Sequence, residues 1–192
     1  MKIVDQTIKI KNVSHALPFE AIEEAARKCF QSKVRDHTTA RDFVQRLIEQ
    51  GHMSPLEHVS FSIEFLTDRG VLLELTRHRI CSFSVQSTRY VAQKEEVTFC
   101  RPVFWEKGSE EMKLWESDMQ VVENMYHSML ESGMKPEEAR TVLPNSLATR
   151  GVMTCNYRQL LHMFSLRCST AAHPQIRALF HELRAGMADA GL

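Results

Sequence analysis

Polar and apolar side chains alternate along parts of the chain with a period of two, which predicts β-strands. Residues 1–13 and 60–65 show this alternation, and residues 149–155 have the composition and length of a third strand. In such a strand one row of side chains faces a core and the other row faces away from it. The pattern therefore predicts a sheet with at least one buried face.

Elsewhere apolar side chains recur three or four residues apart, which predicts helices. The longest stripe is more typical of a buried core face than of a cofactor site and comprises Met112, Trp115, Met119, Val122, Tyr126 and Met129. The helices are expected from about Leu17 to Phe30, over Thr39–Gln50, over Val71–Arg77, from Glu110 to Leu130 with an end near Gly133, over Pro136–Arg140, and from about Asn156 and Pro174.

Two local signals refine this pattern. Thr39 followed three residues later by Asp42 is typical of a helix start, and Gly51 suits a helix end. The segment Ile80–Tyr90 has no clean period and is rich in serine, which predicts a loop. Loops on a regular scaffold often hold binding and catalytic side chains.

Composition limits the classes of protein to consider. The 192 residues suit a single domain over 1–192, and 24 basic side chains balance 24 acidic ones. Zero net charge gives the protein no general attraction for nucleic acid or anionic membranes. No apolar run approaches the roughly 20 residues that cross a bilayer. We therefore expect a cytoplasmic protein with neither nucleic acid nor membrane as a partner.

The chain has an odd number of cysteines, and they follow no Cys-x-x-Cys spacing. This spacing argues against a disulfide framework and against a zinc knuckle, so reduced thiols and no metal site are expected. Cys81 and Cys29 are interpreted as small buried side chains. The five cysteines are Cys29, Cys81, Cys100, Cys155 and Cys168.

The densest polar segment is Arg77-His78-Arg79, followed after seven residues by Ser87 and then Arg89. Guanidinium and hydroxyl groups in this density can hold a phosphate through paired hydrogen bonds. The alternative is a set of solvated surface arginines. The segment interrupts an apolar helix, which favours a binding role.

These residues carry a resemblance to a known family. Arg-His-Arg, seven residues and Ser is the signature of the flavin-dependent thymidylate synthases, and the segment GHMSPLEH at residues 51–58 resembles a second motif of that family. The segments ARTVLP, TCNYRQLLHMF and SLR resemble three further blocks in the same order. The resemblance extends from about Cys29 to Arg177.

The resemblance implies an α/β fold in which a mixed sheet packs against a bundle of helices. It further implies the reductive methylation of dUMP to dTMP, with 5,10-methylenetetrahydrofolate as the carbon donor and FAD, reduced by NADPH, as the hydride carrier. The expected assembly is a homotetramer whose active sites lie between subunits. A protein cysteine nucleophile is not required, because the cofactor supplies the difficult chemistry.

Residue roles follow from the same resemblance. The expected FAD-binding residues are Ser54, Arg77, His78, Arg79, Val85, Asn156, Tyr157, Arg158 and His162. The expected dUMP-binding residues are Glu74, Arg77, Gln86, Ser87, Thr88, Arg89, Arg140 and Arg167. Arg167 is also the expected catalytic residue, since a guanidinium can stabilise charge that develops at N3 and O4 of uracil.

For two of these residues the alternative is a purely structural role. Asn156 can be a helix cap, and Arg167 can be a salt-bridged arginine at a helix end. Glu74 stands where the family commonly has glutamine, and Val85 or Gln86 where an acidic residue is common. A carboxylate at this position lowers affinity for a phosphate-bearing ligand unless Arg77, three residues after Glu74, neutralises it.

Two other functions are possible from the residues alone. A metal-dependent hydrolase could use His52, His58 and His78 with Glu57, although no His-Glu-x-x-His motif is present. A nucleotide-binding or RNA-binding module could stack bases on Phe83 and Tyr90, against which neutral net charge and the lack of an RNA-binding motif both argue.

Overall fold

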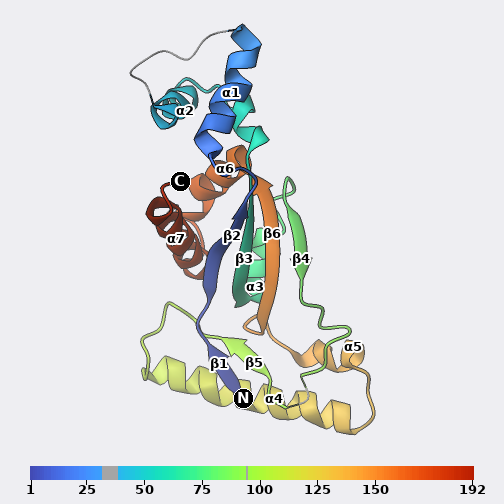
Figure 1. Ribbon diagram of the computed structural model, residues 1–192. Coiled ribbons are helices and arrows are strands. Elements are labelled where there is room, and N and C mark those ends of the chain that lie inside the picture. Colours follow the sequence, from blue (N-terminus) through green and yellow to red (C-terminus); the bar gives the residue numbers. More distant parts are fainter. Residues whose placement is uncertain (32–38, 94) are drawn as a thin grey trace.

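A four-stranded antiparallel sheet forms the centre of the molecule (Figure 1). The computed structural model describes residues 1–31, 39–93 and 95–192. The strand order is β2-β3-β6-β4, with β2 at Thr7–Val13, β3 at Ser60–Asp68, β6 at Ala148–Asn156 and β4 at Ser82–Val85. Two further strands, β1 (Lys2–Val4) and β5 (Thr98–Cys100), pair in parallel as a separate small sheet. The opening segment, expected as one strand, thus divides into two.

Helices surround the sheet on several sides. The short sheet lies beside the long helix α4, whereas α1 and α2 lie beyond one end of the central sheet (Figure 1). None of the helices in the described ranges is long and apolar enough to cross a membrane. Their bounds are α1 Pro18–Phe30, α2 Ala40–Glu49, α3 Arg69–Leu75, α4 Glu110–Glu131, α5 Pro136–Ala139, α6 Tyr157–Arg167 and α7 Pro174–Asp189, with 3₁₀ turns at Ser54–His58 and Arg140–Val142.

The local signals in the sequence explain much of this architecture. In β3 the predicted alternation holds, because Phe61, Ile63 and Phe65 are fully buried while the polar positions between them are not. The Thr39 side chain accepts a hydrogen bond from the Asp42 amide and so begins α2. The stripe on α4 packs into a second core between this helix and β5, as predicted.

Two predictions need correction, and one strand was not predicted. Ile80–Tyr90 is not a loop throughout, because Ser82–Val85 forms β4 and pairs with β6. Its own alternation of serine with Phe83 and Val85 is the pattern of a half-buried strand. The sequence analysis did not identify β5. Cys29 is exposed rather than buried.

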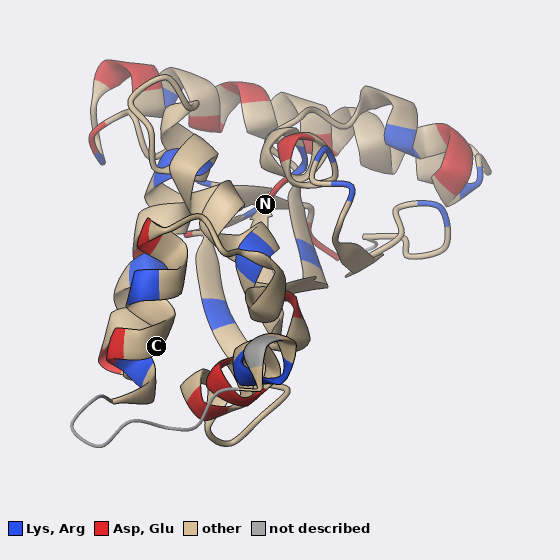
Figure 2. Cartoon of the chain, turned by 90° about the horizontal axis from the view of Figure 1, so that it is seen from above, with Lys and Arg blue, Asp and Glu red and all other residues tan. Residues whose placement is uncertain are grey.

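Charged side chains are dispersed over the surface. Figure 2 shows blue and red segments on all sides of the view rather than one continuous basic face. A phosphate-binding region therefore has to be a local cluster of side chains.

Candidate functional site

The last residue of α6, Arg167, is held by two residues from the end of α3 and the turn after it. The Arg167 Nε donates to Nε2 of His78 at 2.9 Å, Nη1 donates to the Glu74 carboxylate at 2.6 Å, and Nη2 donates to the Glu74 carbonyl oxygen at 3.1 Å. We call Glu74, His78 and Arg167 the Arg167 cluster. The Glu74 carboxylate thus pairs with Arg167 rather than with Arg77, the partner that the sequence spacing suggested.

His78 is an uncharged member of this cluster near neutral pH. Its side chain is buried, and burial, the Arg167 guanidinium and then His162 lower the pKa of His78 from 6.5 to about 4. The His162 ring lies edge-on at 6.5 Å between ring centroids. A neutral imidazole can accept through Nε2, which matches the bond from Arg167.

The geometry leaves part of the Arg167 guanidinium free to bind a ligand. A guanidinium carries five N–H groups, and the Arg167 cluster uses three of them. One N–H on each terminal nitrogen is left over. Donors of this kind can reach acceptors of a planar ligand that lie in the plane of the guanidinium.

A cavity of about 660 Å³ lies along α6, and we call it the α6 pocket. Apolar side chains from three elements line it together with polar groups of α6. The Arg158 guanidinium donates to the Glu57 carboxylate at 2.6 Å, with both side chains about half exposed. The lining residues are Ile48, Met53, Glu57, Ile80, Asn156, Arg158, Gln159, Leu161, His162 and Ser165.

Four predicted residues in and just before α6 have different environments. The Asn156 side chain accepts from the Gln159 amide at 2.9 Å, so it caps the helix and also borders the pocket. Arg158 and His162, one turn apart, both line the same cavity, as the spacing predicted. The ring of Tyr157 instead packs against Phe19 and Phe61, and Tyr157 is not among the residues that line the α6 pocket.

A second group of predicted residues gathers around the turn after α5. The Arg140 guanidinium donates to the Thr88 hydroxyl at 3.2 Å, and Arg89 forms an ion pair with Glu137 at 2.7 Å. We call Thr88, Arg89 and Arg140 the Arg140 cluster. Beside it lies a cavity of about 230 Å³ that Arg69 also lines. Arg69 was not among the predicted site residues, since its place after Asp68 indicated only a turn.

The remaining predicted residues lie outside both clusters. Arg77 and Arg79 are exposed, and within the described ranges neither side chain has a hydrogen bond or an ion pair. Ser87 accepts from the Arg89 amide at 3.2 Å. Ser54 is exposed at the start of a 3₁₀ turn, Val85 ends β4, and Gln86 is exposed directly after it.

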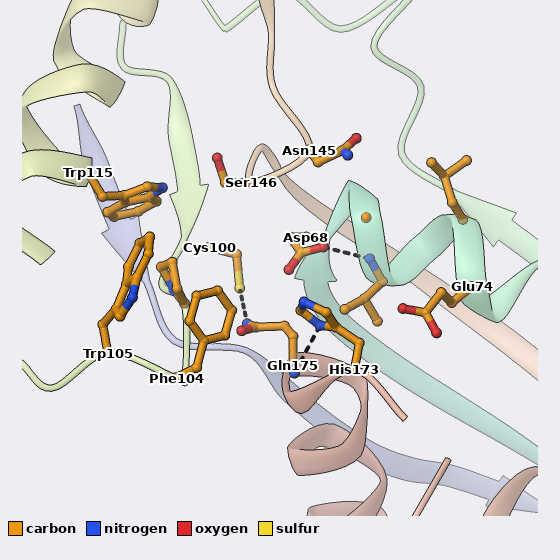
Figure 3. A pocket seen from close by; sticks show the side chains of 14 residues that line it. Asp68, Glu74, Cys100, Phe104, Trp105, Trp115, Asn145, Ser146, His173 and Gln175 are labelled. Atoms are coloured by element: carbon orange, nitrogen blue, oxygen red, sulfur yellow. Dashed lines mark hydrogen bonds between the residues drawn. The ribbon is translucent and has the colours of Figure 1, made fainter. Parts of the chain in front are cut away.

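Figure 3 shows a further cavity, of about 400 Å³, whose aromatic walls the sequence analysis did not foresee. Trp105 and Trp115 lie on one side of it, and Asp68 and Glu74 approach from the strand β3 and the helix α3. Burial raises the pKa of the Asp68 carboxyl. Because Glu74 belongs to both, this aromatic cavity adjoins the Arg167 cluster.

The proposed metal ligands do not come together. His78 is buried against Arg167, whereas His52, His58 and Glu57 are exposed. Over the described ranges no three histidine, cysteine or acidic side chains are grouped as a metal site. The arrangement therefore gives no support to a metal-dependent hydrolase.

Comparison with known sequences agrees with the motifs. The family described as thymidylate synthase complementing protein matches residues 12–190. The flavin-dependent thymidylate synthase of Geobacter sulfurreducens is 38% identical over 177 residues, which cover 86% of this chain and 75% of that protein. The enzyme of the same name from Clostridium tetani is 31% identical, covering 92% and 80%.

Comparison with solved structures agrees with the fold. Thymidylate synthase X from Helicobacter pylori, crystallised with FAD and dUMP, has a TM-score of 0.79 at 25% identity and covers 94% of this chain and 92% of its own. A UMP/dUMP methylase from Streptomyces cacaoi has a TM-score of 0.80 at 24% identity, covering 98% and 93%. The second likeness concerns the fold alone.

Proposed function

This chain belongs to the flavin-dependent thymidylate synthase family, and from that premise we propose how its own residues methylate dUMP. The Arg167 cluster orients and polarises the uracil ring, the Arg140 cluster holds the phosphate, and the α6 pocket holds FAD. These assignments keep the roles that the sequence predicted for Arg167, Arg140 and His162.

The observation that carries the proposal is the fixed orientation of Arg167. Three of its N–H groups are engaged by Glu74 and His78, so the side chain loses little conformational freedom when a ligand binds. The remaining N–H groups would donate to O4 of uracil, and the guanidinium charge would stabilise the negative charge that develops at N3 and O4. Donors that are oriented before the reaction stabilise developing charge without the cost of reorganisation.

The α6 pocket suits part of a flavin nucleotide. Its volume of about 660 Å³ lies within the range of small-molecule sites. Met53, Ile80 and Leu161 supply apolar contacts for a flat ring, and the Arg158 guanidinium supplies charge for a diphosphate. When bound, FAD supplies the hydride for the methyl group.

The neutral state of His78 has a role in this scheme. A protonated imidazole could not accept from Arg167, and two positive charges in contact would repel. With a pKa of about 4, His78 stays neutral and keeps Arg167 in place near pH 7. Arg77 and Arg79, which are exposed, remain available for the phosphates of either nucleotide.

We further propose that NADPH reduces the flavin, that 5,10-methylenetetrahydrofolate donates the carbon, and that the enzyme is a homotetramer in the cytoplasm. Support for the assembly comes from exposed apolar side chains within two residues of cluster members in the sequence, which are Leu73, Ile80, Tyr90 and Leu166. Contact with another copy would remove these apolar side chains from water. The Arg167 cluster of one copy and the Arg140 cluster of another would then meet at one dUMP molecule.

Purified protein supplied with FAD provides the direct test. We expect a visible flavin spectrum that bleaches anaerobically with NADPH, and dTMP formation that requires dUMP, 5,10-methylenetetrahydrofolate and FAD together. Omitting each component in turn is the control. Protein that binds FAD but never forms dTMP from this mixture would contradict the proposal.

A further inference from the structure

Two cysteine side chains meet directly beside the α6 pocket. Cys81 follows the Arg77-His78-Arg79 segment by two residues, and Cys155 immediately precedes the helix cap Asn156. The Cys155 and Cys81 thiols lie close enough for each to shift the pKa of the other. The Cys81 sulfur also lies 3.8 Å from the Met163 sulfur.

The register of β4 with β6 explains why the two thiols meet. Ser82, the first residue of β4, lies opposite Thr154, and continuing this register by one residue sets Cys81 against Cys155. At the other end of this ladder, the Gln86 amide donates to the carbonyl of Arg150, the residue opposite it. A bond between directly opposite residues identifies a hydrogen-bonded pair, and such pairs alternate with non-hydrogen-bonded ones along an antiparallel ladder.

The cysteine pair lies five steps along the ladder from the hydrogen-bonded pair of Gln86 and Arg150. Because the two kinds of pair alternate, the cysteines fall at a non-hydrogen-bonded position. At such positions the Cα atoms approach to roughly 4.5 Å and the side chains lie closest. Disulfides join Cα atoms that are about 4.4 to 6.8 Å apart. The backbone therefore already has a spacing that a disulfide can bridge.

We propose that Cys81 and Cys155 are an oxidation site at which a cross-strand disulfide forms and weakens flavin binding in the α6 pocket. The oxidant is a small-molecule disulfide such as oxidised glutathione. The effect on flavin binding rests on the proposed function, whereas formation of the disulfide does not.

The exchange proceeds in two balanced steps. The Cys81 thiolate, having lost its proton to solvent, attacks one glutathione sulfur and releases the other half as a thiolate, which leaves a mixed disulfide on Cys81. The Cys155 thiolate then attacks the Cys81 sulfur, and the second glutathione leaves. Two protein thiols are oxidised by two electrons, and one glutathione disulfide is reduced to two glutathione thiols.

The environments of the two sulfurs assign them to these steps. Cys81 is partly exposed, and the contact with Cys155 lowers the pKa of its thiol. Cys155 is buried, and the Cys81 contact and then burial raise the pKa of its thiol. Cys81 is therefore the attacking residue and Cys155 the resolving residue.

The neighbours of the pair connect oxidation to the pocket. Ile80 and Asn156, which adjoin the two cysteines in sequence, both line the α6 pocket. A disulfide fixes the separation of the two strands at this point, so these two lining residues can no longer move apart when a ligand enters. The pocket then cannot widen at the end where Asn156 caps α6, and flavin binding weakens.

The experiment uses the full chain with Cys29→Ser, which removes an exposed competing thiol on α1. Folded protein is incubated with oxidised glutathione, alkylated, and analysed by peptide mass spectrometry and by FAD titration. We expect a peptide pair linked through Cys81 and Cys155, lighter by two hydrogen atoms than the separate peptides, and FAD affinity that falls severalfold. Dithiothreitol should reverse both changes.

Two variants keep the outcome decisive. In Cys155→Ser the reaction should stop with one glutathione on Cys81, and in Cys81→Ser neither product should form at position 155. If folded protein forms no link between the two cysteines, the oxidation site is refuted. If the link forms and FAD affinity stays unchanged, its effect on the pocket is refuted, whereas reduced protein that does not bind FAD would count against the proposed function alone.

Discussion

The Arg167 cluster and the Arg140 cluster use the same chemical groups in opposite settings. In the first, the Arg167 side chain is 17% exposed and has three defined hydrogen bonds to its neighbours. In the second, Arg89 and Glu137 are 56% and 38% exposed, and Arg140 reaches only the Thr88 hydroxyl. The Arg167 side chain is therefore held in place by contacts within one chain, whereas the Arg140 cluster is open to solvent.

This difference suits the two roles that we propose for the clusters, which are charge stabilisation on uracil and phosphate binding. Charge developing on the uracil ring needs donors that are already oriented, which partial burial and a fixed ion pair provide. A phosphate dianion is attracted by exposed arginines with freely moving side chains, and contact with a second subunit can complete its site. We therefore expect mutations in the Arg167 cluster to affect turnover and mutations in the Arg140 cluster to affect affinity.

The largest effect is expected for Arg167→Lys. Lysine keeps the positive charge and loses the planar pair of donors, so turnover should fall by about 10²- to 10³-fold, the usual cost of losing an oriented donor. FAD content should stay close to that of the wild type. The exposed Arg184→Lys on α7 is the matched control, and equal turnover in both variants would remove Arg167 from the catalytic role.

Arg140→Lys should act on substrate affinity instead. The loss of a charge-assisted hydrogen bond to phosphate is expected to raise the KM for dUMP about tenfold, with kcat nearly unchanged. Steady-state kinetics over a range of dUMP concentrations measure both quantities. A fall in kcat at constant KM would place Arg140 with the Arg167 cluster and so erase the distinction between the two.

A smaller effect is expected for Glu74→Gln. The amide oxygen can still accept from Arg167, but the ion pair of 2.6 Å loses its negative charge. We expect kcat to fall by roughly threefold to tenfold, because a hydrogen bond to a charged group is stronger than one between neutral groups. Glu137→Gln provides the comparison. It removes the same charge from an exposed ion pair with Arg89, so this variant should leave kcat unchanged.

The smallest effect concerns the pH dependence of folding. His78 has a folded pKa of about 4, below the ordinary value of 6.5, so the unfolded chain binds more protons between these values. This contribution to stability is complete above pH 6.5 and is lost as the pH falls toward 4. Urea unfolding of the wild type and His78→Gln across this window should show a weaker pH dependence in the variant. Parallel curves would show that His78 is not held neutral.

Features of the fold could be predicted from the sequence where their contacts are local, and the contacts within the Arg167 cluster are not. The cap at Thr39 and the alternation of β3 depend on neighbours within a few residues, and both were predicted correctly. The pair of Glu74 with Arg167 joins residues 93 positions apart, which no local pattern encodes. Spacing along the sequence therefore suggested Arg77 as the partner of Glu74, whereas the packing of α6 against the turn after α3 selects Arg167.

The aromatic cavity and Arg69 were missed for a related reason. Trp115 belongs to a stripe on α4 whose spacing predicts only a core face, and Trp105 lies in a segment without a period. Their approach to Asp68 depends on how α4 and the end of β3 pack (Figure 3). The roles of the motif residues His78, Asn156 and His162 stay predictions of the family resemblance, and the structure places His78 in the Arg167 cluster and the other two at the α6 pocket.

The central claim is that one dUMP site combines the Arg167 cluster of one copy with the Arg140 cluster of another. Arg167→Lys and Arg140→Ala chains, each impaired alone, can be co-expressed and purified as mixed assemblies. With random mixing, about one quarter of the sites would receive both intact arginines from different copies, so activity should approach one quarter of the wild-type value. Activity that stays at the average of the two single variants would contradict a shared site.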